Sequence, residues 1–114
     1  MIEEKFKILQ FIRELILALE RELEAFPKKD IDIKVRIRTS LYDMLELAYE
    51  ANTTQNIENK KGLIVKIISK VKVIDFLLSM ACDKKLITEK KYCKLGLRLG
   101  DIAKYSNAWL KNIS

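Results

Sequence analysis

The chain has 114 residues, of which 49% are hydrophobic and 33% are charged. This length supports one modest hydrophobic core and excludes a second, so we expect a single domain over residues 1–114. Lys and Arg outnumber Asp and Glu by 22 to 16, and the resulting formal net charge of +6 favours polyanionic partners.

The positions of the charged residues, the apolar runs and the two cysteines indicate which kinds of protein this chain can be. Residues 84–114 carry eight basic and two acidic side chains, whereas residues 1–26 carry four and six, so positive charge gathers in the C-terminal half. No stretch reaches the roughly 18 apolar residues of a membrane span, and no signal-peptide pattern opens the chain. We therefore expect a cytoplasmic protein with no membrane partner. Cys82 and Cys93 have no histidine with which to bind zinc or form a thiol–imidazole pair, so we expect thiols packed between helices.

Apolar residues recur at helical spacing, and only three Gly and one Pro interrupt them, which predicts an all-α chain. The first helix is expected over residues 2–26, before Pro27. Its main apolar row has steps of three and four: Ile2, Phe6, Leu9, Ile12, Ile16, Leu19, Leu23 and Phe26. A second helix is expected to reach about residue 52, with Asp30 or Asp32 as its N-cap. Its inward residues are predicted to be Ile33, Ile37, Leu41, Met44, Leu45 and Ala48.

Turn-forming residues 52–56 separate the second helix from a third, which begins at Ile57 or near Gly62 and ends near residue 83. Its inward residues are predicted to be Ile64, Ile67, Val71, Ile74, Leu78 and Ala81. The fourth helix is expected from a Thr88 cap to about residue 113, with an inward row of Tyr92, Leu95, Leu99, Ile102 and Trp109. Gly96 and Gly100, four residues apart, either admit another backbone closely or weaken the helix, and we favour the close approach.

Short connections between four long helices predict an antiparallel up-down-up-down four-helix bundle. Further apolar side chains lie beyond the main rows, including Phe11 and Leu15 on the first helix and Val35, Tyr42 and Tyr49 on the second. Such additional rows are typical of an interface with another chain, or of a monomer with a large core. The sequence leaves both interpretations open.

Groups that support catalysis are scarce. The chain contains no histidine, and none of its three glycines belongs to a phosphate-binding loop. Glu46 and Glu50 lie one helical turn apart, a spacing typical of a solvated face. We expect a protein that is not an enzyme, with no catalytic residue, no metal site and no cofactor.

Basic side chains are the remaining candidates for a functional site. Lys66 with Lys70, and Lys94 with Arg98, each share a helix face, and if the two faces adjoin they form a stripe that neutralises several phosphates. A second basic group opens the second helix: Lys34, Arg36 and Arg38. The alternative for all of these is an ordinary solvated surface. Three aromatic residues of the fourth helix are expected in the core rather than stacked on bases: Tyr92, Tyr105 and Trp109.

Two long segments carry a family resemblance. They read FPKKDIDIKVRIRTSLYDMLELAYEANTT and KVKVIDFLLSMACDKKLITEKKYCKLGLRLGDIAKYSNAWLK. A phenylalanine-proline-basic opening, an apolar LYDMLELAYEA segment and a final helix ending in tryptophan resemble the accessory variability determinant (Avd) proteins of diversity-generating retroelements. Bundle proteins of ribosomal RNA intervening sequences are similar, but they carry a serine-proline-serine-asparagine stretch where this chain has TSLYDMLELAYEA.

The resemblance implies a homo-oligomer, a pentamer in that family, which binds the retroelement reverse transcriptase and template RNA or DNA during mutagenic reverse transcription. By this analogy seven residues are candidates for nucleic-acid or polymerase contact: Lys34, Arg36, Arg38, Lys66, Lys70, Lys94 and Arg98. The alternative function is a structural or protein-interaction bundle of the intervening-sequence type, with no nucleic-acid role.

Overall fold

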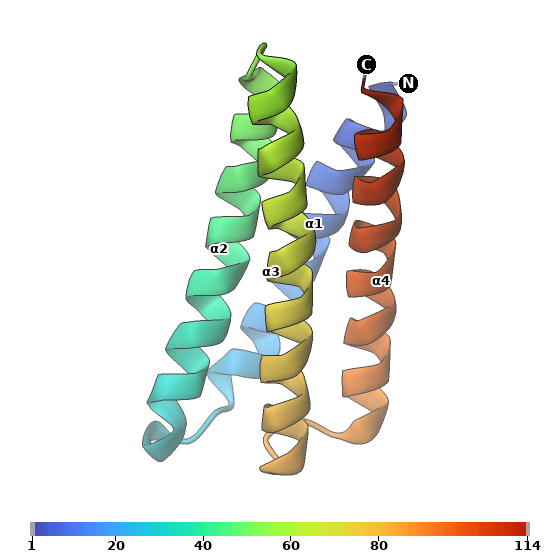
Figure 1. Ribbon diagram of the computed structural model, residues 1–114. Helices are drawn as coiled ribbons and strands as arrows, with labels where there is room; N and C mark the ends of the chain where they lie inside the picture. Colours follow the sequence, from blue (N-terminus) through green and yellow to red (C-terminus); the bar gives the residue numbers. More distant parts are fainter. Residues whose placement is uncertain (1, 114) are drawn as a thin grey trace.

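The computed structural model describes residues 2–113, and the side chains from residue 6 onward (Figure 1). These residues form four α-helices and a short 3-10 helix, with no strand. The elements are α1 (Ile2–Glu24), η1 (Lys28–Asp30), α2 (Ile31–Thr53), α3 (Ile57–Asp83) and α4 (Glu89–Asn112). Successive helices alternate in direction, so the start of α1 and the end of α4 lie at the same end of the molecule.

The helices form a closed ring in chain order. Helix α1 packs against α2 and α4, and α3 packs against the same two helices, whereas α1 and α3 lie diagonally across the core. The result is a rod of 46 × 23 × 19 Å. The predicted antiparallel four-helix bundle is confirmed.

The core positions of α3 and α4 agree closely with the predicted rows. All six predicted residues of α3 are buried, as are Leu95, Leu99, Ile102 and Trp109 of α4, while Tyr92 is partly buried. In α2 the prediction holds except at Leu45, which is partly buried. Apolar residues at helical spacing thus specify most of the bundle interior.

The predicted row on α1 is wrong in its first half. Phe6 is 55% exposed, and Leu9 is partly buried. Ile8 and Leu15 are instead fully buried. The physical reason is that α1 contacts two neighbours, α2 and α4, so its buried face is centred between two possible rows. Ile2, the first residue of the predicted row, lies outside the described side chains.

Helix ends follow local capping chemistry. Helix α1 ends at Glu24 rather than at the predicted residue 26, and Phe26 lies in the following turn, where it is still buried. Asp30 occupies the N-cap position of α2, but its side chain caps nothing and instead lies 3.4 Å from Lys84 Nζ. Asn56 and Thr88 accept hydrogen bonds from the first-turn amides of α3 and α4 at 3.0 and 3.1 Å. Helix α3 therefore begins at Ile57, and the predicted Thr88 cap is confirmed.

The connection between α3 and α4 is a tight left-handed turn. Lys85 has a φ of 66°, and its amide donates to Cys82 O at 3.0 Å. The Leu86 amide donates to Ala81 O at 2.9 Å. This pair of hydrogen bonds satisfies the last carbonyls of α3 in the manner of a Schellman motif, although glycine is the usual residue at the left-handed position. The turn directs α4 back along α3.

The predicted close backbone approach at Gly96 and Gly100 is wrong within the described chain. A Cβ atom placed at either glycine would have no neighbour within 4 Å. The inward row Leu95, Leu99 and Ile102 holds α4 in the bundle, and the glycines lie to the side of it. They leave open space and lower the helix propensity of α4.

Candidate nucleic-acid interface

Two sides of α4 are occupied by neighbouring helices. On the side of α1, Lys91 Nζ lies 3.1 Å from Glu22 Oε1, and Arg98 donates to Glu14 Oε1 at 3.4 Å. On the side of α3, the Tyr92 hydroxyl donates to Asp75 Oδ1 at 3.2 Å. Burial of Tyr92 and the nearby Asp75 carboxylate raise the pKa of that hydroxyl. The remaining side of α4 faces outward.

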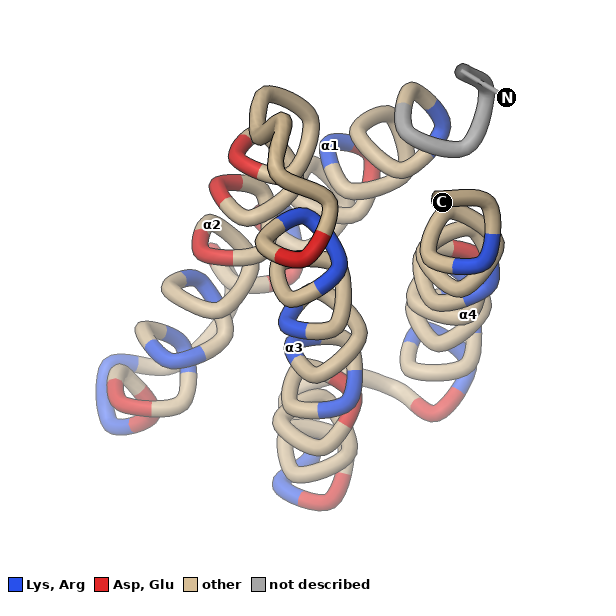
Figure 2. Tube along the Cα trace, turned by 45° about the horizontal axis from the view of Figure 1, so that its top comes forward, with Lys and Arg blue, Asp and Glu red and all other residues tan. Residues whose placement is uncertain are grey.

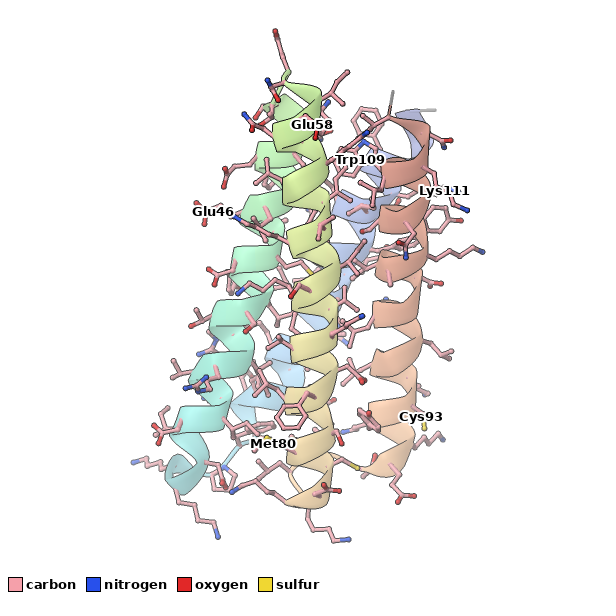
Figure 3. The ribbon with its side chains drawn as sticks, viewed as in Figure 1. Glu46, Glu58, Met80, Cys93, Trp109 and Lys111 are labelled. Atoms are coloured by element: carbon pink, nitrogen blue, oxygen red, sulfur yellow. The ribbon has the colours of Figure 1, made fainter. Side chains whose placement is uncertain are left out.

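The outward row of α4 recurs in steps of three and four residues and consists of Lys90, Lys94, Leu97, Asp101, Lys104, Ala108 and Lys111. Its four lysines are exposed. Among the described side chains, Lys90, Lys94 and Lys111 have no carboxylate partner, and the Lys104 ammonium lies 5.6 Å from the centre of the Tyr105 ring. Lys111 points away from the bundle in Figure 3, and basic positions predominate along α4 in Figure 2.

The length of this outward row matches an extended polyanion. At a rise of about 1.5 Å per residue, Lys90 and Lys111 lie about 32 Å apart along the helix. This is close to one turn of B-form duplex, and lysines at such positions can displace counterions from successive phosphates. Asp101 is the single carboxylate in the row. The outward row of α4 is therefore the candidate nucleic-acid interface.

Three of the seven predicted contact residues form ion pairs with carboxylates of neighbouring helices. Arg38 donates to both oxygens of Glu20, at 2.9 and 2.6 Å. Lys70 Nζ lies 3.4 Å from Asp43 Oδ2, and Arg98 pairs with Glu14. These pairs join α2 to α1, α3 to α2 and α4 to α1. In each pair the carboxylate partly neutralises the cation, so the attraction of that cation for a phosphate outside the bundle is weaker.

The Glu20–Arg38 pair is the best-organised of these contacts. The hydrogen bond from Arg38 is the main cause of the lowered pKa of Glu20, and the same bond raises the pKa of Arg38. Tyr42 donates a further hydrogen bond to Glu20 at 3.3 Å. A two-point contact fixes the arginine plane, so Arg38 serves the α1–α2 interface.

The other four predicted residues do not form one stripe. Lys66 lines a groove of about 280 Å³ between α2 and α3, together with the carboxylates Asp43, Glu46 and Glu50. Arg36 lines a different hollow, beside Leu77 and Met80 near the opposite end of α3. Lys34 is partly buried on α2. Lys94 belongs to the outward row of α4.

The two faces predicted to adjoin are also separate. Lys70 faces α2, and Arg98 faces α1, so the bundle lies between them. Sequence reasoning missed Lys90, Lys104 and Lys111 as members of a common face, although all three belong to the basic population of the fourth helix. The helical spacing of the sequence does predict this face. The row on the side of the helix opposite the predicted inward row consists of positions 90, 94, 97, 101, 104, 108 and 111.

The aromatic side chains of α4 support the bundle. Trp109 is 7% exposed and lies between α4 and α3 in Figure 3. The Tyr105 ring lies 5.4 Å from the ring of Phe11, and the Lys7 ammonium lies 5.1 Å from it. The core location predicted for Trp109 is confirmed, and Tyr105 contributes to the α1–α4 contact.

Other chemical features are few in the part of the chain that the structure describes. It contains no group of three or more His, Cys, Asp or Glu placed to hold a metal ion. It also contains no helix with the length and apolar character needed to span a bilayer. Cys82 is partly buried against the core, as predicted, but Cys93 is exposed, so the packing role predicted for that second thiol is wrong.

Comparison of the chain with protein-family models, with curated proteins and with solved structures finds no match.

Proposed function

We propose that this protein is a nucleic-acid-binding bundle that acts through a charged surface rather than through bond-breaking chemistry. The observation that carries the proposal is the outward row of α4, where none of the four lysines has a carboxylate partner among the described side chains. Lysines spaced along a helix contact phosphates without reading bases. Binding is therefore expected to be tolerant of sequence and sensitive to salt.

The resemblance stated above supports a more specific role. We propose that the chain is an accessory protein of a diversity-generating retroelement, and that it holds template RNA while it contacts the reverse transcriptase as a homo-oligomer. The outward row supplies the RNA surface in this proposal. The polymerase then binds elsewhere on the bundle, since the row is occupied by RNA.

Two charge-matched variants test the RNA surface. The first replaces Lys94, Lys104 and Lys111 by Glu, and the second replaces Lys34, Arg36 and Lys66 by Glu. Each lowers the formal net charge from +6 to 0, so a difference between them reports location rather than total charge. We expect the first variant to lose most of its affinity for a labelled RNA in an anisotropy titration, and the second to lose much less. Equal losses would contradict the assignment to α4.

Association with the polymerase needs its own test. Affinity capture of the retroelement reverse transcriptase, performed after nuclease treatment, should recover the wild-type chain and the α4 variant equally. Recovery of neither chain would contradict the accessory role while leaving RNA binding in place. Circular dichroism of both variants establishes that helix content is unchanged.

A second candidate function, a protein-interaction bundle without a nucleic-acid role, is favoured by a different observation. Large apolar side chains of α3, including Val65 and Phe76, are 52% and 62% exposed. An apolar surface of this kind is typical of contact between proteins. Absence of RNA binding at low salt, combined with self-association or capture of a protein, would favour this candidate.

A further inference from the structure

The outward face of α3 is apolar along most of its length. Its row recurs in steps of three and four residues: Gly62, Val65, Ser69, Val73, Phe76 and Met80. The four large members are 52%, 45%, 62% and 38% exposed in chain order. Met80 marks the lower end of this row in Figure 3. We call these six residues the α3 outward row.

Nothing within the described chain covers the α3 outward row. Helices α2 and α4 flank α3, and α1 lies across the core on its other side. The opposite face of α3 already supplies core residues such as Ile67, Ile74 and Leu78. Helix α3 thus carries an apolar row on each of two opposite faces, and charged residues such as Lys70, Lys72 and Asp75 lie between the two rows. An apolar row that the bundle leaves uncovered is typical of contact with another protein surface, so α3 has the composition of a helix with one neighbour missing.

We propose that this neighbour is α3 of a second copy of the chain, packed antiparallel with a two-fold axis near residues 71 and 72. The first half of the row has small side chains, at Gly62, Val65 and Ser69. The second half has larger ones, at Val73, Phe76 and Met80. Antiparallel pairing places each large half against the small half of the other copy. Phe76 then lies between Val65 and Ser69, and Met80 lies over Gly62.

Charges at the two ends of α3 favour the same orientation. Antiparallel pairing brings Lys61 of one copy near Asp83 of the other, and Glu58 near Lys84. Parallel pairing would instead bring each of these residues near its own copy, so that like charges meet at both ends. Lys84 already lies 3.4 Å from Asp30, and Glu58 would add a second carboxylate to that pair.

One like-charge contact remains in the antiparallel arrangement. Lys72 is exposed beside the row and lies close to the two-fold axis, where it meets Lys72 of the second copy. Such a repulsion weakens a contact without preventing it, because long lysine side chains can turn toward solvent. Replacement of Lys72 by Ala is therefore expected to strengthen the association, whereas most interface truncations weaken it.

The size of the contact sets the expected strength. Gly62 and Met80 lie about 27 Å apart along the helix at a rise of about 1.5 Å per residue. A contact through one helix of that length lies at the small end of specific interfaces, below about 1,200 Å² in total. The expected species is a dimer whose population rises with chain concentration. Since a two-fold contact uses the same face twice, it differs from the ring of five implied by the family resemblance, which needs two different faces per chain.

Analytical ultracentrifugation over a range of concentrations tests the proposal. The wild-type chain should pass from one to two chains in mass as its concentration rises. Phe76→Asp should stay monomeric, and Lys72→Ala should dimerise at lower concentration than the wild type. Leu97→Asp, at a side chain 74% exposed on α4, is the matched control and should behave as the wild type. A monomer at every concentration, a mass of five chains, or dimerisation of Phe76→Asp would overturn the proposal.

Disulfide trapping tests the orientation. In a Cys82→Ser, Cys93→Ser background, Lys72→Cys should form an intermolecular disulfide, because the two thiols meet near the axis. Met80→Cys should not, because the two thiols lie at opposite ends of the contact. Efficient cross-linking through position 80 would overturn the antiparallel arrangement. RNA binding by Phe76→Asp is measured separately, so failure of the pairing and failure of the proposed function are distinguishable.

Discussion

The Ser106 hydroxyl gives a sharp test of how the core of this bundle is assembled. Ser106 lies on the inward face of α4, between Ile102 and Trp109, and is 0% exposed. Its Oγ has no hydrogen-bond partner among the described residues. A buried polar group without a partner loses its hydrogen bonds to water and gains nothing in return. Ser106→Ala should therefore stabilise the fold.

The expected size of this effect combines two contributions. Leaving a hydroxyl unsatisfied costs about 1–3 kcal/mol, and serine in a helix interior costs about 0.5 kcal/mol relative to alanine. Ser106→Ala should thus raise the free energy of unfolding by about 1.5–3.5 kcal/mol. For a domain of this size, each kcal/mol shifts the melting temperature by about 4 °C.

Urea unfolding followed by circular dichroism measures the difference. Ser69→Ala, on the exposed face of α3, changes helix propensity without removing a buried hydroxyl and is the matched control. Both variants are compared at low chain concentration, where self-association does not contribute. The reasoning fails if Ser106→Ala is less stable than the wild type, or gains no more than Ser69→Ala, because the hydroxyl then has a favourable contact.

Three further predictions concern single residues. Gly100→Ala should raise the free energy of unfolding by about 1 kcal/mol, because the position is helical and no described atom beyond the adjacent turns of α4 lies within 4 Å of the added methyl; a loss measured in urea would show that another group approaches there. Thr88→Ala should lower it by about 1 kcal/mol through loss of the cap of α4, and an unchanged urea midpoint would contradict that role. The hydrogen bond from Arg38 lowers the pKa of Glu20 below its ordinary 4.5, so this pair stabilises the fold above that value and the stabilisation is lost as the pH falls through the lower folded pKa. Acid unfolding of Glu20→Gln should lack this component; identical pH profiles for variant and wild type would refute it.

The fold could be predicted because each helix carries its own pattern. In α3, apolar residues at steps of three and four mark the buried face directly, and all six predicted residues are buried. On α1, Ile8 and Phe6 lie on adjacent rows of one broad apolar surface, and the choice between them depends on the positions of α2 and α4. That information lies in the packing, which a single-helix pattern does not contain.

The candidate site was predicted less well for a related physical reason. Whether a cation is free depends on which carboxylate the neighbouring helix brings to it. Lys94 and Arg98 are both basic residues on the same predicted helix, and the sequence pattern does not distinguish them. In the structure, α1 places Glu14 beside Arg98, whereas Lys94 faces outward. The helical spacing that predicts the inward row of α4 also predicts the outward row on the opposite face.

The most direct test of the proposed RNA surface is the salt dependence of RNA affinity. Each phosphate contact with a single strand contributes about 0.7 to the slope of log affinity against log salt concentration. The wild-type chain should show a steep negative slope, and replacement of Lys94, Lys104 and Lys111 by Glu should reduce its magnitude by at least about 2. An unchanged slope, or an affinity that does not respond to salt in the wild type, would contradict binding through the outward row of α4.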